Sequence, residues 1–306
     1  MNLSRRDVLA AGAASLLPLK ALGALEPPQK TLRVAHMTDF HVQPELHAAE
    51  GMAKALEHAM GRKPGLILAG GDLIMDGFAQ TEARTKLQWE LFTKISRDHA
   101  GVSIHPAMGN HDVWGWNKKD SHTDGSERLW AKKWFTDLFH LERTYYSFDK
   151  GAWHFVVLDD IALTPDGYNG MVGPEQREWL ADDLAKTKKP TVVLSHIPIL
   201  SVTGLAGGYD QAKGEWNVGG STMAKDSNEL RALFFKNKHV KIALSGHTHV
   251  LDRVDFDGVS YLCGGAVCGA WWKGNNGNTK PGYRLLDLHS DGSFDERYVP
   301  WGWKPA

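Results

Sequence analysis

The stretch Gly109-Asn110-His111-Asp112 follows an apolar run, Val102 to Met108, that predicts a short buried strand. A strand that ends in this way presents polar side chains at a sheet edge, where α/β proteins place their sites. The Asn110 amide oxygen suits a divalent cation, His111 can transfer a proton near neutral pH, and Asp112 can fix the imidazole tautomer. The alternative is an ordinary turn, in which Gly-Asn supplies the bend and His-Asp caps a helix.

Four further apolar runs end in residues of the same chemical kind. They deliver, in chain order, Asp39-Phe40-His41, Asp72, His196 and Gly246-His247-Thr248-His249. Two metal ions held close together need a bridging carboxylate, and Asp72 suits that role because two glycines before it allow close approach. The i, i+2 spacing of Asp39/His41 and His247/His249 should return both side chains to one side of a strand end. One such pair could be a solvated loop end, but five such strand ends in one chain indicate a metal centre.

In order and spacing, these five blocks resemble the calcineurin-like metallophosphoesterases over roughly residues 31–270. The resemblance implies an α/β fold, a four-layer αββα sandwich of two mixed β-sheets flanked by helices, with the site at the strand ends. It also implies two divalent or trivalent metal ions drawn from iron, manganese and zinc. One metal would be bound by Asp39, His41, Asp72 and His249, and the other by Asp72, Asn110, His196 and His247. His111 would be the proton donor or a stabiliser of the transition state, oriented by Asp112.

The implied reaction is hydrolysis of a small-molecule phosphate ester. Two metals about 3.5–4 Å apart hold a hydroxide and clamp the phosphoryl oxygens. A histidine of near-neutral pKa can then protonate the departing alkoxide, which favours phosphodiesters because their leaving groups are poorer. Cyclic nucleotides and lipid-linked phosphates are candidate substrates. A phosphomonoesterase is one alternative. A non-catalytic metal-binding scaffold is another, but it would be expected to lack a ligand, and none is missing.

The first 24 residues are predicted to be a targeting signal rather than part of the fold. Arg5-Arg6 precedes a short apolar run from Val8 to Leu19, which resembles a twin-arginine export signal. This run is too short to span a bilayer, and no later run of about 18 apolar residues occurs. We therefore expect export in the folded state through the twin-arginine translocase to the periplasm or beyond, without a stable membrane anchor. A cytosolic protein with an apolar start is the alternative.

The rest of the chain divides into a spacer at 25–30, a catalytic domain at 31–270 and a C-terminal extension, 271–306, expected to pack on that domain. Lys and Arg together number 35 and Asp and Glu 36, so no nucleic acid polymer is expected as a partner. The two cysteines, Cys263 and Cys268, flank a Gly-Gly turn; buried thiols and a disulfide are both open.

Alternation and apolar runs predict most of the secondary structure. Strands are expected at 31–38, 66–69, 102–108, 145–148, 153–158, 191–194, 241–244, 259–263, 283–288 and 296–300, and helices at 47–60, 81–99, 174–186 and 227–238. Residues 114–140 are expected to form an inserted loop and helix beside the site, and 203–221 a long glycine-rich loop. In these segments Trp114, Trp116, Tyr209 and Trp216 could stack an aromatic leaving group, with plain packing as the alternative.

Overall fold

A computed structural model describes residues 31–305. The expected export signal at 1–24 and the spacer at 25–30 lie outside the described residues. Within the described part of the chain, no helix has both the length and the apolar character needed to cross a bilayer.

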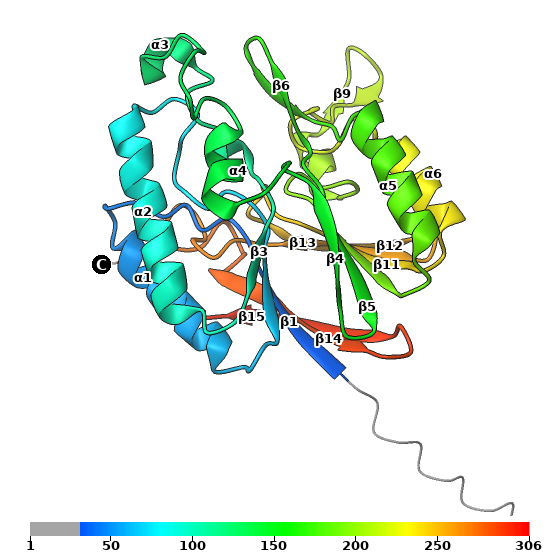
Figure 1. Cartoon of the computed structure of the whole chain (residues 1–306). Coiled ribbons are helices and arrows are strands. Elements are labelled where there is room, and N and C mark those ends of the chain that lie inside the picture. Colours follow the sequence, from blue (N-terminus) through cyan, green and yellow to red (C-terminus); the bar gives the residue numbers. More distant parts are fainter. Residues whose placement is uncertain (1–30, 306) are drawn as a thin grey trace, which may run out of the picture. The chain divides into compact units, whose positions relative to one another are not determined.

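The first sheet has five strands in the order β15-β14-β1-β2-β3 (Figure 1). The strands are β1 (Thr31–Met37), β2 (Leu66–Ala69), β3 (Ile104–Pro106), β14 (Gly282–His289) and β15 (Phe294–Pro300). The central strand β1 pairs in parallel with β2 and antiparallel with β14, so the sheet is mixed, as predicted. Strand β3 is shorter than the expected 102–108 and ends at Pro106, although the Ala107 amide still donates to the Ala69 carbonyl of β2 at 2.8 Å.

The second sheet has six strands in the order β12-β13-β11-β8-β5-β4 and is also mixed. The strands are β4 (Tyr146–Lys150), β5 (Trp153–Val157), β8 (Thr191–Leu194), β11 (Val240–Ser245), β12 (Leu251–Phe256) and β13 (Val259–Gly264). Its inner strands β5, β8 and β11 run parallel to one another, so their carboxyl ends meet at one edge.

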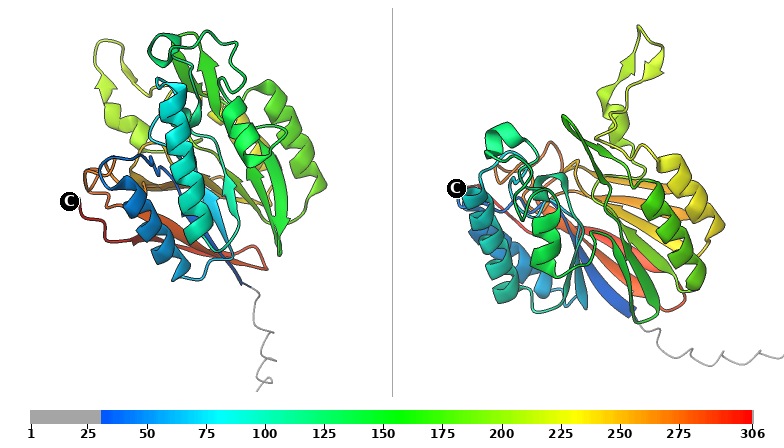
Figure 2. Two further views of the ribbon diagram at one scale, coloured as in Figure 1. Left: turned by 60° about the vertical axis from the view of Figure 1, so that its left-hand side comes forward. Right: turned by 45° about the horizontal axis from the view of Figure 1, so that its top comes forward.

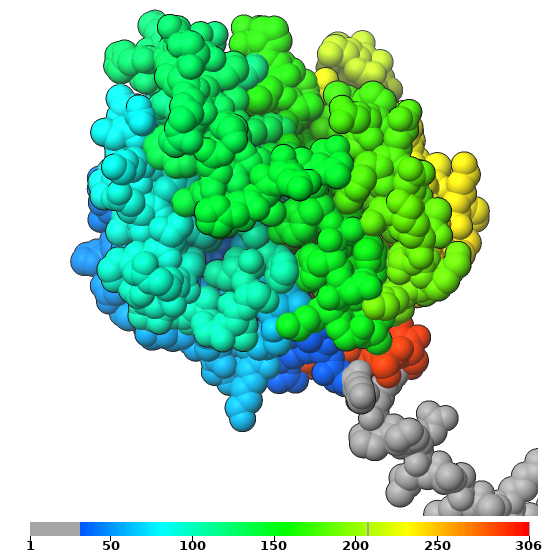
Figure 3. Space-filling model, in the orientation of Figure 1, coloured from blue at the N-terminus to red at the C-terminus, as the bar shows by residue number. Residues whose placement is uncertain are grey.

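Helices cover the outer face of each sheet, which gives the four layers that the resemblance implied (Figure 2). Helices α1 (Ala48–Met60) and α2 (Glu82–His99) pack on the first sheet, and α5 (Pro174–Lys186) and α6 (Ser227–Lys236) on the second. In the space-filling view, α2, α4 (Lys133–Phe139) and α5 occupy much of one face (Figure 3).

Three apolar interfaces hold these layers together. One lies between α1, α2 and the first sheet, one between the two sheets, and one between the second sheet and α5 and α6. In β2, Leu66 and Leu68 face the second sheet while Ile67 and Ala69 face the helices. A strand buried on both faces reads as an unbroken apolar run, which is why its bounds were predicted correctly from the sequence.

Some elements were not predicted. Strands β6 (Ile161–Thr164) and β7 (Gly167–Gly170) form a hairpin in a segment for which no element was predicted. The 203–221 segment is not an unstructured loop, because it contains a 3-10 turn, Thr203–Gly207, and a short hairpin of β9 (Tyr209–Asp210) and β10 (Glu215–Trp216). Both hairpins rise at the top of Figure 1. The insert at 114–140 contains α3 (Lys118–Ser121) and α4.

The C-terminal extension contacts α1 and the loop after β1. The Trp272 ring is buried, and its Nε1 donates a hydrogen bond to the His41 carbonyl oxygen at 3.0 Å. A Cβ atom at Gly51, in α1, would lie 2.3 Å from Cζ3 of Trp272. The absence of a side chain at Gly51 therefore lets the extension approach the helix.

We expect Gly51→Ala to destabilise the fold. Alanine is the better helix former by roughly 1 kcal/mol, but a methyl group here overlaps the Trp272 ring, and overpacking costs roughly 1–3 kcal/mol. Because the 2.3 Å contact places this site at the upper end of that cost, the expected net loss is about 2 kcal/mol, which is measured by urea denaturation. Gly167→Ala is the matched control, because its Cβ meets no atom within 4 Å and its midpoint should not move. Equal midpoints for both variants would contradict close packing at Gly51.

Candidate metal centre

The seven predicted metal ligands lie together at the carboxyl ends of β1, β2, β3, β8 and β11. They are Asp39, His41, Asp72, Asn110, His196, His247 and His249. Six of them are at most 5% exposed, and only His247 is partly exposed. Residues up to 210 positions apart (39 to 249) therefore meet in one buried polar cluster.

The Asp72 carboxylate lies between two groups of histidines. Its Oδ2 is 3.5 Å from Nε2 of His41 on one side and 3.2 Å from Nε2 of His196 on the other. One oxygen that faces two imidazole nitrogens from separate groups has the position of a bridging ligand.

The two groups are each completed by one member of the His-x-His pair. On the first side, Nε2 of His249 lies 3.0 Å from Nε2 of His41 and 3.3 Å from Oδ1 of Asp39. On the second side, Nε2 of His196 lies 3.2 Å from both Oδ1 of Asn110 and Nδ1 of His247. This division of the side chains agrees with the one that the resemblance implied.

Five of these residues have left-handed backbone conformations. The φ angles are 56° for Asp39, 43° for His41, 51° for Asp72, 68° for His247 and 56° for His249. Asp and His are among the residue types that tolerate this region, but it remains uncommon for any residue other than glycine. Strain of this kind persists only where the surrounding structure imposes it, and it gathers at functional sites.

Backbone pairing between the turns imposes this conformation. The amide of Asp39 donates to the Gly71 carbonyl and the amide of His41 to the Asp72 carbonyl, both at 3.0 Å. The first ligand turn is therefore hydrogen-bonded to the second beyond the end of β1. The side chains of Asp39 and His41 are oriented by this pairing and not by the alternation of a strand, as their i, i+2 spacing had suggested. A Cβ at Gly109 would lie 2.2 Å from Oδ1 of Asp72, so the third turn also needs its glycine.

Backbone carbonyls fix two of the imidazoles. Nδ1 of His196 lies 2.8 Å from the Gly70 oxygen, and Nδ1 of His249 lies 2.6 Å from the Gly269 oxygen. A carbonyl can only accept, so Nδ1 carries the proton in both rings. With Nδ1 donating, each Nε2 points into the cluster, the arrangement that orients histidines toward metals.

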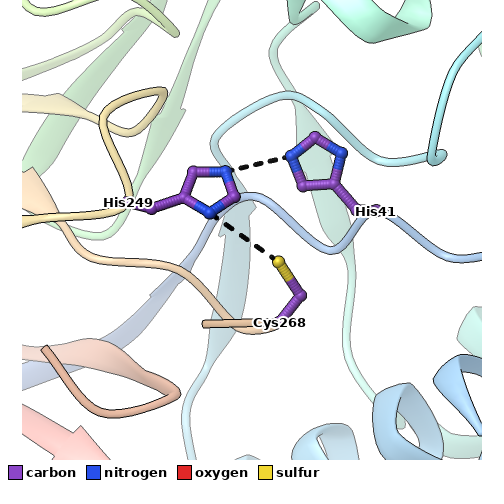
Figure 4. Close-up of side chains that lie close together, drawn as sticks. All are labelled: His41, His249 and Cys268. Carbon is purple, nitrogen blue, oxygen red and sulfur yellow. Dashed lines mark hydrogen bonds between the residues drawn. The ribbon is translucent and has the colours of Figure 1, made fainter. Parts of the chain in front are cut away.

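A buried thiol adjoins the first group of ligands. Sγ of Cys268 is 3.9 Å from Nδ1 of His249, on the side of the ring opposite His41 (Figure 4). Cys268 therefore contacts the edge of His249 that faces away from Asp39. The structure records Cys263 and Cys268 as free, buried thiols rather than a disulfide.

The charges in the cluster are balanced by protons. Burial opposes ionisation of both carboxylates, yet the neighbouring histidines lower the pKa of Asp39 and of Asp72. Burial also disfavours the charged imidazoles, but Asp72 raises the pKa of His196 to about 10 and Asp39 raises that of His249 well above its usual value. Burial lowers the pKa of His41 to about 3 and that of His247 to about 4.

This pattern fits the binding of metal ions. The raised pKa values of His196 and His249 beside two carboxylates mean that the cluster favours positive charge, and metal binding would displace protons from these imidazoles. Nδ1 of His41 has no hydrogen-bond partner despite its burial. Nitrogen and oxygen donors such as these bind iron, manganese and zinc, so the donor set does not identify the metal.

His111 lies beside the first group of ligands, but Asp112 does not orient it. The His111 ring centroid is 4.9 Å from that of His41, and its amide donates to Oδ1 of Asp72 at 2.9 Å. Its Nδ1 faces Oδ1 of Asp76 at 3.5 Å. Asp76, which no sequence pattern singles out, is thus the carboxylate next to the imidazole.

Asp112 instead joins the ligand turns to one another. Its carboxylate accepts hydrogen bonds from the amides of Leu73 and Gly109 at 2.8 Å and of Ile74 at 3.2 Å. Residues 110–112 form a 3-10 turn, in which successive side chains point about 120° apart. For this reason His111 and Asp112 face different surroundings although they are adjacent in sequence.

Other residues that support the cluster were also missed. Oδ1 of Asp160 accepts the His196 amide at 3.2 Å, and Oγ1 of Thr38 donates to Oδ2 of Asp39 at 2.6 Å. The Tyr168 ring lies 6.2 Å from that of His247, and the Trp271 ring lies 4.5 Å from that of His249. Single polar or aromatic residues carry no spacing signal, so no pattern in the sequence points to these four.

The four aromatic residues considered as stacking groups pack elsewhere. Trp114 is buried, Trp116 stacks on Trp130 at 4.7 Å, and Tyr209 and Trp216 meet edge to face at 5.8 Å. Across residues 31–305, none of the four has a ring contact with a predicted ligand.

Two mixed sheets between helix layers, with a buried cluster of acid, amide and histidine side chains at their edge, fit the class of metal-dependent phosphoesterases. The sequence profile of the calcineurin-like phosphoesterases matches residues 32–251, and the chain belongs to this family.

Two relatives carry similar names. The chain is 28% identical over 153 residues to a 3',5'-cyclic-nucleotide phosphodiesterase of Nostoc sp., an alignment that covers 48% of this chain and about half, 52%, of the relative. It is 23% identical over 273 residues to a probable cyclic nucleotide phosphodiesterase of Synechococcus sp., covering 86% of this chain and 90% of that protein.

Solved structures share the fold. A dimetal phosphatase from Danio rerio has a TM-score of 0.57 at 14% identity, over 89% of this chain and 99% of that one. A purple acid phosphatase from yellow lupin also has a TM-score of 0.57, at 16% identity, over 90% of this chain and 53% of that one.

Metal ions should stabilise the folded chain, because they would replace the protons that balance Asp39 and Asp72. A ligand at 100 times its Kd contributes about 2.7 kcal/mol, which corresponds to a rise in Tm of roughly 5–10 °C for a domain of this size. Thermal unfolding with added Mn²⁺ and with a chelator measures the difference. Asp72→Asn keeps the shape of the side chain but removes its charge, so this variant should lose most of the rise in Tm that metal produces. The same Tm with metal and with chelator would contradict the metal centre.

Proposed function

We propose that this protein is a metal-dependent phosphodiesterase with a dinuclear centre formed by the seven ligands. The observation that carries the proposal is the position of the Asp72 carboxylate, with one oxygen facing both His41 and His196 at 3.5 and 3.2 Å. When bound, two metals would neutralise the phosphoryl oxygens and lower the pKa of the attacking water.

The chain's own residues would orient the site and move the proton. Burial disfavours the charged form of His111, but Asp72 and then Asp76 raise its pKa, and Asp76, which is not among the candidate ligands, would still favour the imidazolium beside bound metals. With Nδ1 facing Asp76, Nε2 is the atom left to protonate the leaving oxygen. Asp112 and Asp160 hold the backbone of the ligand turns in place.

The names of the two relatives support cyclic nucleotides as the first substrates to test. The direct experiment compares bis(p-nitrophenyl) phosphate with p-nitrophenyl phosphate in the presence of Mn²⁺. Preferential hydrolysis of the diester supports the proposal, and preference for the monoester would make the protein a phosphatase. Metal binding without turnover of either ester would make it a scaffold on the same fold.

A substitution at His111 tests the proton-transfer step without removing a candidate metal ligand. His111→Ala should keep the metal content but slow hydrolysis of diesters with alkoxide leaving groups by roughly 10²–10⁴-fold, the usual contribution of a general acid. Esters of p-nitrophenol should be slowed less, because that group leaves without a proton. Asp76→Asn should give a milder form of the same pattern. Equal losses on both kinds of ester would make His111 an electrostatic stabiliser.

We also propose export of the folded protein through the twin-arginine translocase to the periplasm or beyond, on the sequence of residues 1–24 alone. Replacing Arg5 and Arg6 by lysine should retain the precursor in the cytoplasm, as measured by cell fractionation. Arg62→Lys, an arginine-to-lysine change outside the expected signal, is the control and should be exported normally. Undiminished export of the first variant would rule out this route.

A further inference from the structure

An exposed tryptophan covers the first group of ligands. The Trp271 ring is tilted by 31° to the His249 ring at 4.5 Å and lies 6.1 Å from His41. It is 40% exposed, whereas Trp272, the next residue, is 1% exposed and packs with Trp301 and Trp303. Trp272 thus belongs to the core. Trp271 lies beside two candidate metal ligands, His249 and His41, and part of its own surface is exposed to solvent.

The backbone of Trp271 has a conformation that tryptophan rarely adopts. Its φ angle is 48° and that of Trp272 is 68°, so two consecutive bulky residues occupy the left-handed region. For a bulky side chain this conformation is an outlier, and it persists only where the neighbouring structure imposes it.

The loop that carries Trp271 is joined to the ligand turns on both sides. Nε1 of Trp272 donates to the His41 carbonyl, and Nδ2 of Asn276 donates to the His249 carbonyl at 3.2 Å. The Cys268 amide donates to the Asp39 carbonyl at 3.2 Å. The indole is therefore fixed relative to the candidate metals rather than placed on a free loop.

We propose that Trp271 is the stacking surface for a planar aromatic group of the substrate, so that the site favours nucleotide-like phosphodiesters over aliphatic ones. The inference rests on the proposed function, because it places the phosphate at the adjoining ligands. An aromatic face beside a phosphate site binds a nucleobase through stacking and burial of apolar area, and it does not distinguish one base from another.

Binding of two phosphates to the Mn²⁺-loaded protein, measured by calorimetry, tests the stacking surface without relying on turnover. The wild type should bind adenosine 5'-monophosphate more tightly than ribose 5-phosphate. Trp271→Ala should weaken binding of the nucleotide by roughly 10–100-fold and leave ribose 5-phosphate unchanged. Trp271→Phe should restore most of the preference. Trp216→Ala, which removes a 58% exposed tryptophan from β10, is the control and should bind like the wild type.

Two results would overturn the inference. One is a wild type that binds both phosphates equally, even if it hydrolyses diesters. The other is a Trp271→Ala protein with reduced metal content by elemental analysis, which would make the indole a shield for His249. The protein could also show a nucleotide preference that depends on Trp271 and yet hydrolyse no diester. That result would support the stacking surface and contradict the proposed function.

Discussion

Two carboxylates, Asp39 and Asp72, are buried where the ends of the two sheets meet, and the local structure is arranged around their charge. Buried anions need positive charge and hydrogen bonds close by. His249 and His196 supply the first, and the amides of His247 and His111 supply the second. Because the compensating groups come from turns far apart in sequence, any ligand turn that moves leaves an unbalanced charge in the cluster.

The left-handed turns show the energetic cost of this arrangement. Each such residue costs about 1–3 kcal/mol, and five ligands share the conformation. The three apolar interfaces between the layers offset that cost, since they fix the strand ends from which the turns start. The apolar core between the sheets and helices therefore stabilises the fold, and the strained turns at the sheet edge hold the polar side chains of the candidate site.

The four layers were implied by the family resemblance, whereas the strands and the polar residues at their ends were predicted from short-range patterns. Runs such as Leu66–Ala69 and Thr191–Leu194 are buried on both faces and have no competing interpretation. The role given to Asp112 was wrong because a 3-10 turn separates neighbouring side chains, which residue order does not reveal. Asp76 and Trp271 were missed because their partners are set by tertiary packing, and no spacing rule connects them to the ligands.

Strand β1 is the first described element in the chain, yet it lies at the centre of its sheet, between β2 and β14. Its antiparallel partner begins only at Gly282. During synthesis, β1 and the ligand turn after it therefore emerge from the ribosome long before the strand that completes their pairing. Contacts of such long sequence separation slow folding. The candidate metal ligands extend from Asp39 to His249, so their cluster can form only after most of the chain has been synthesised.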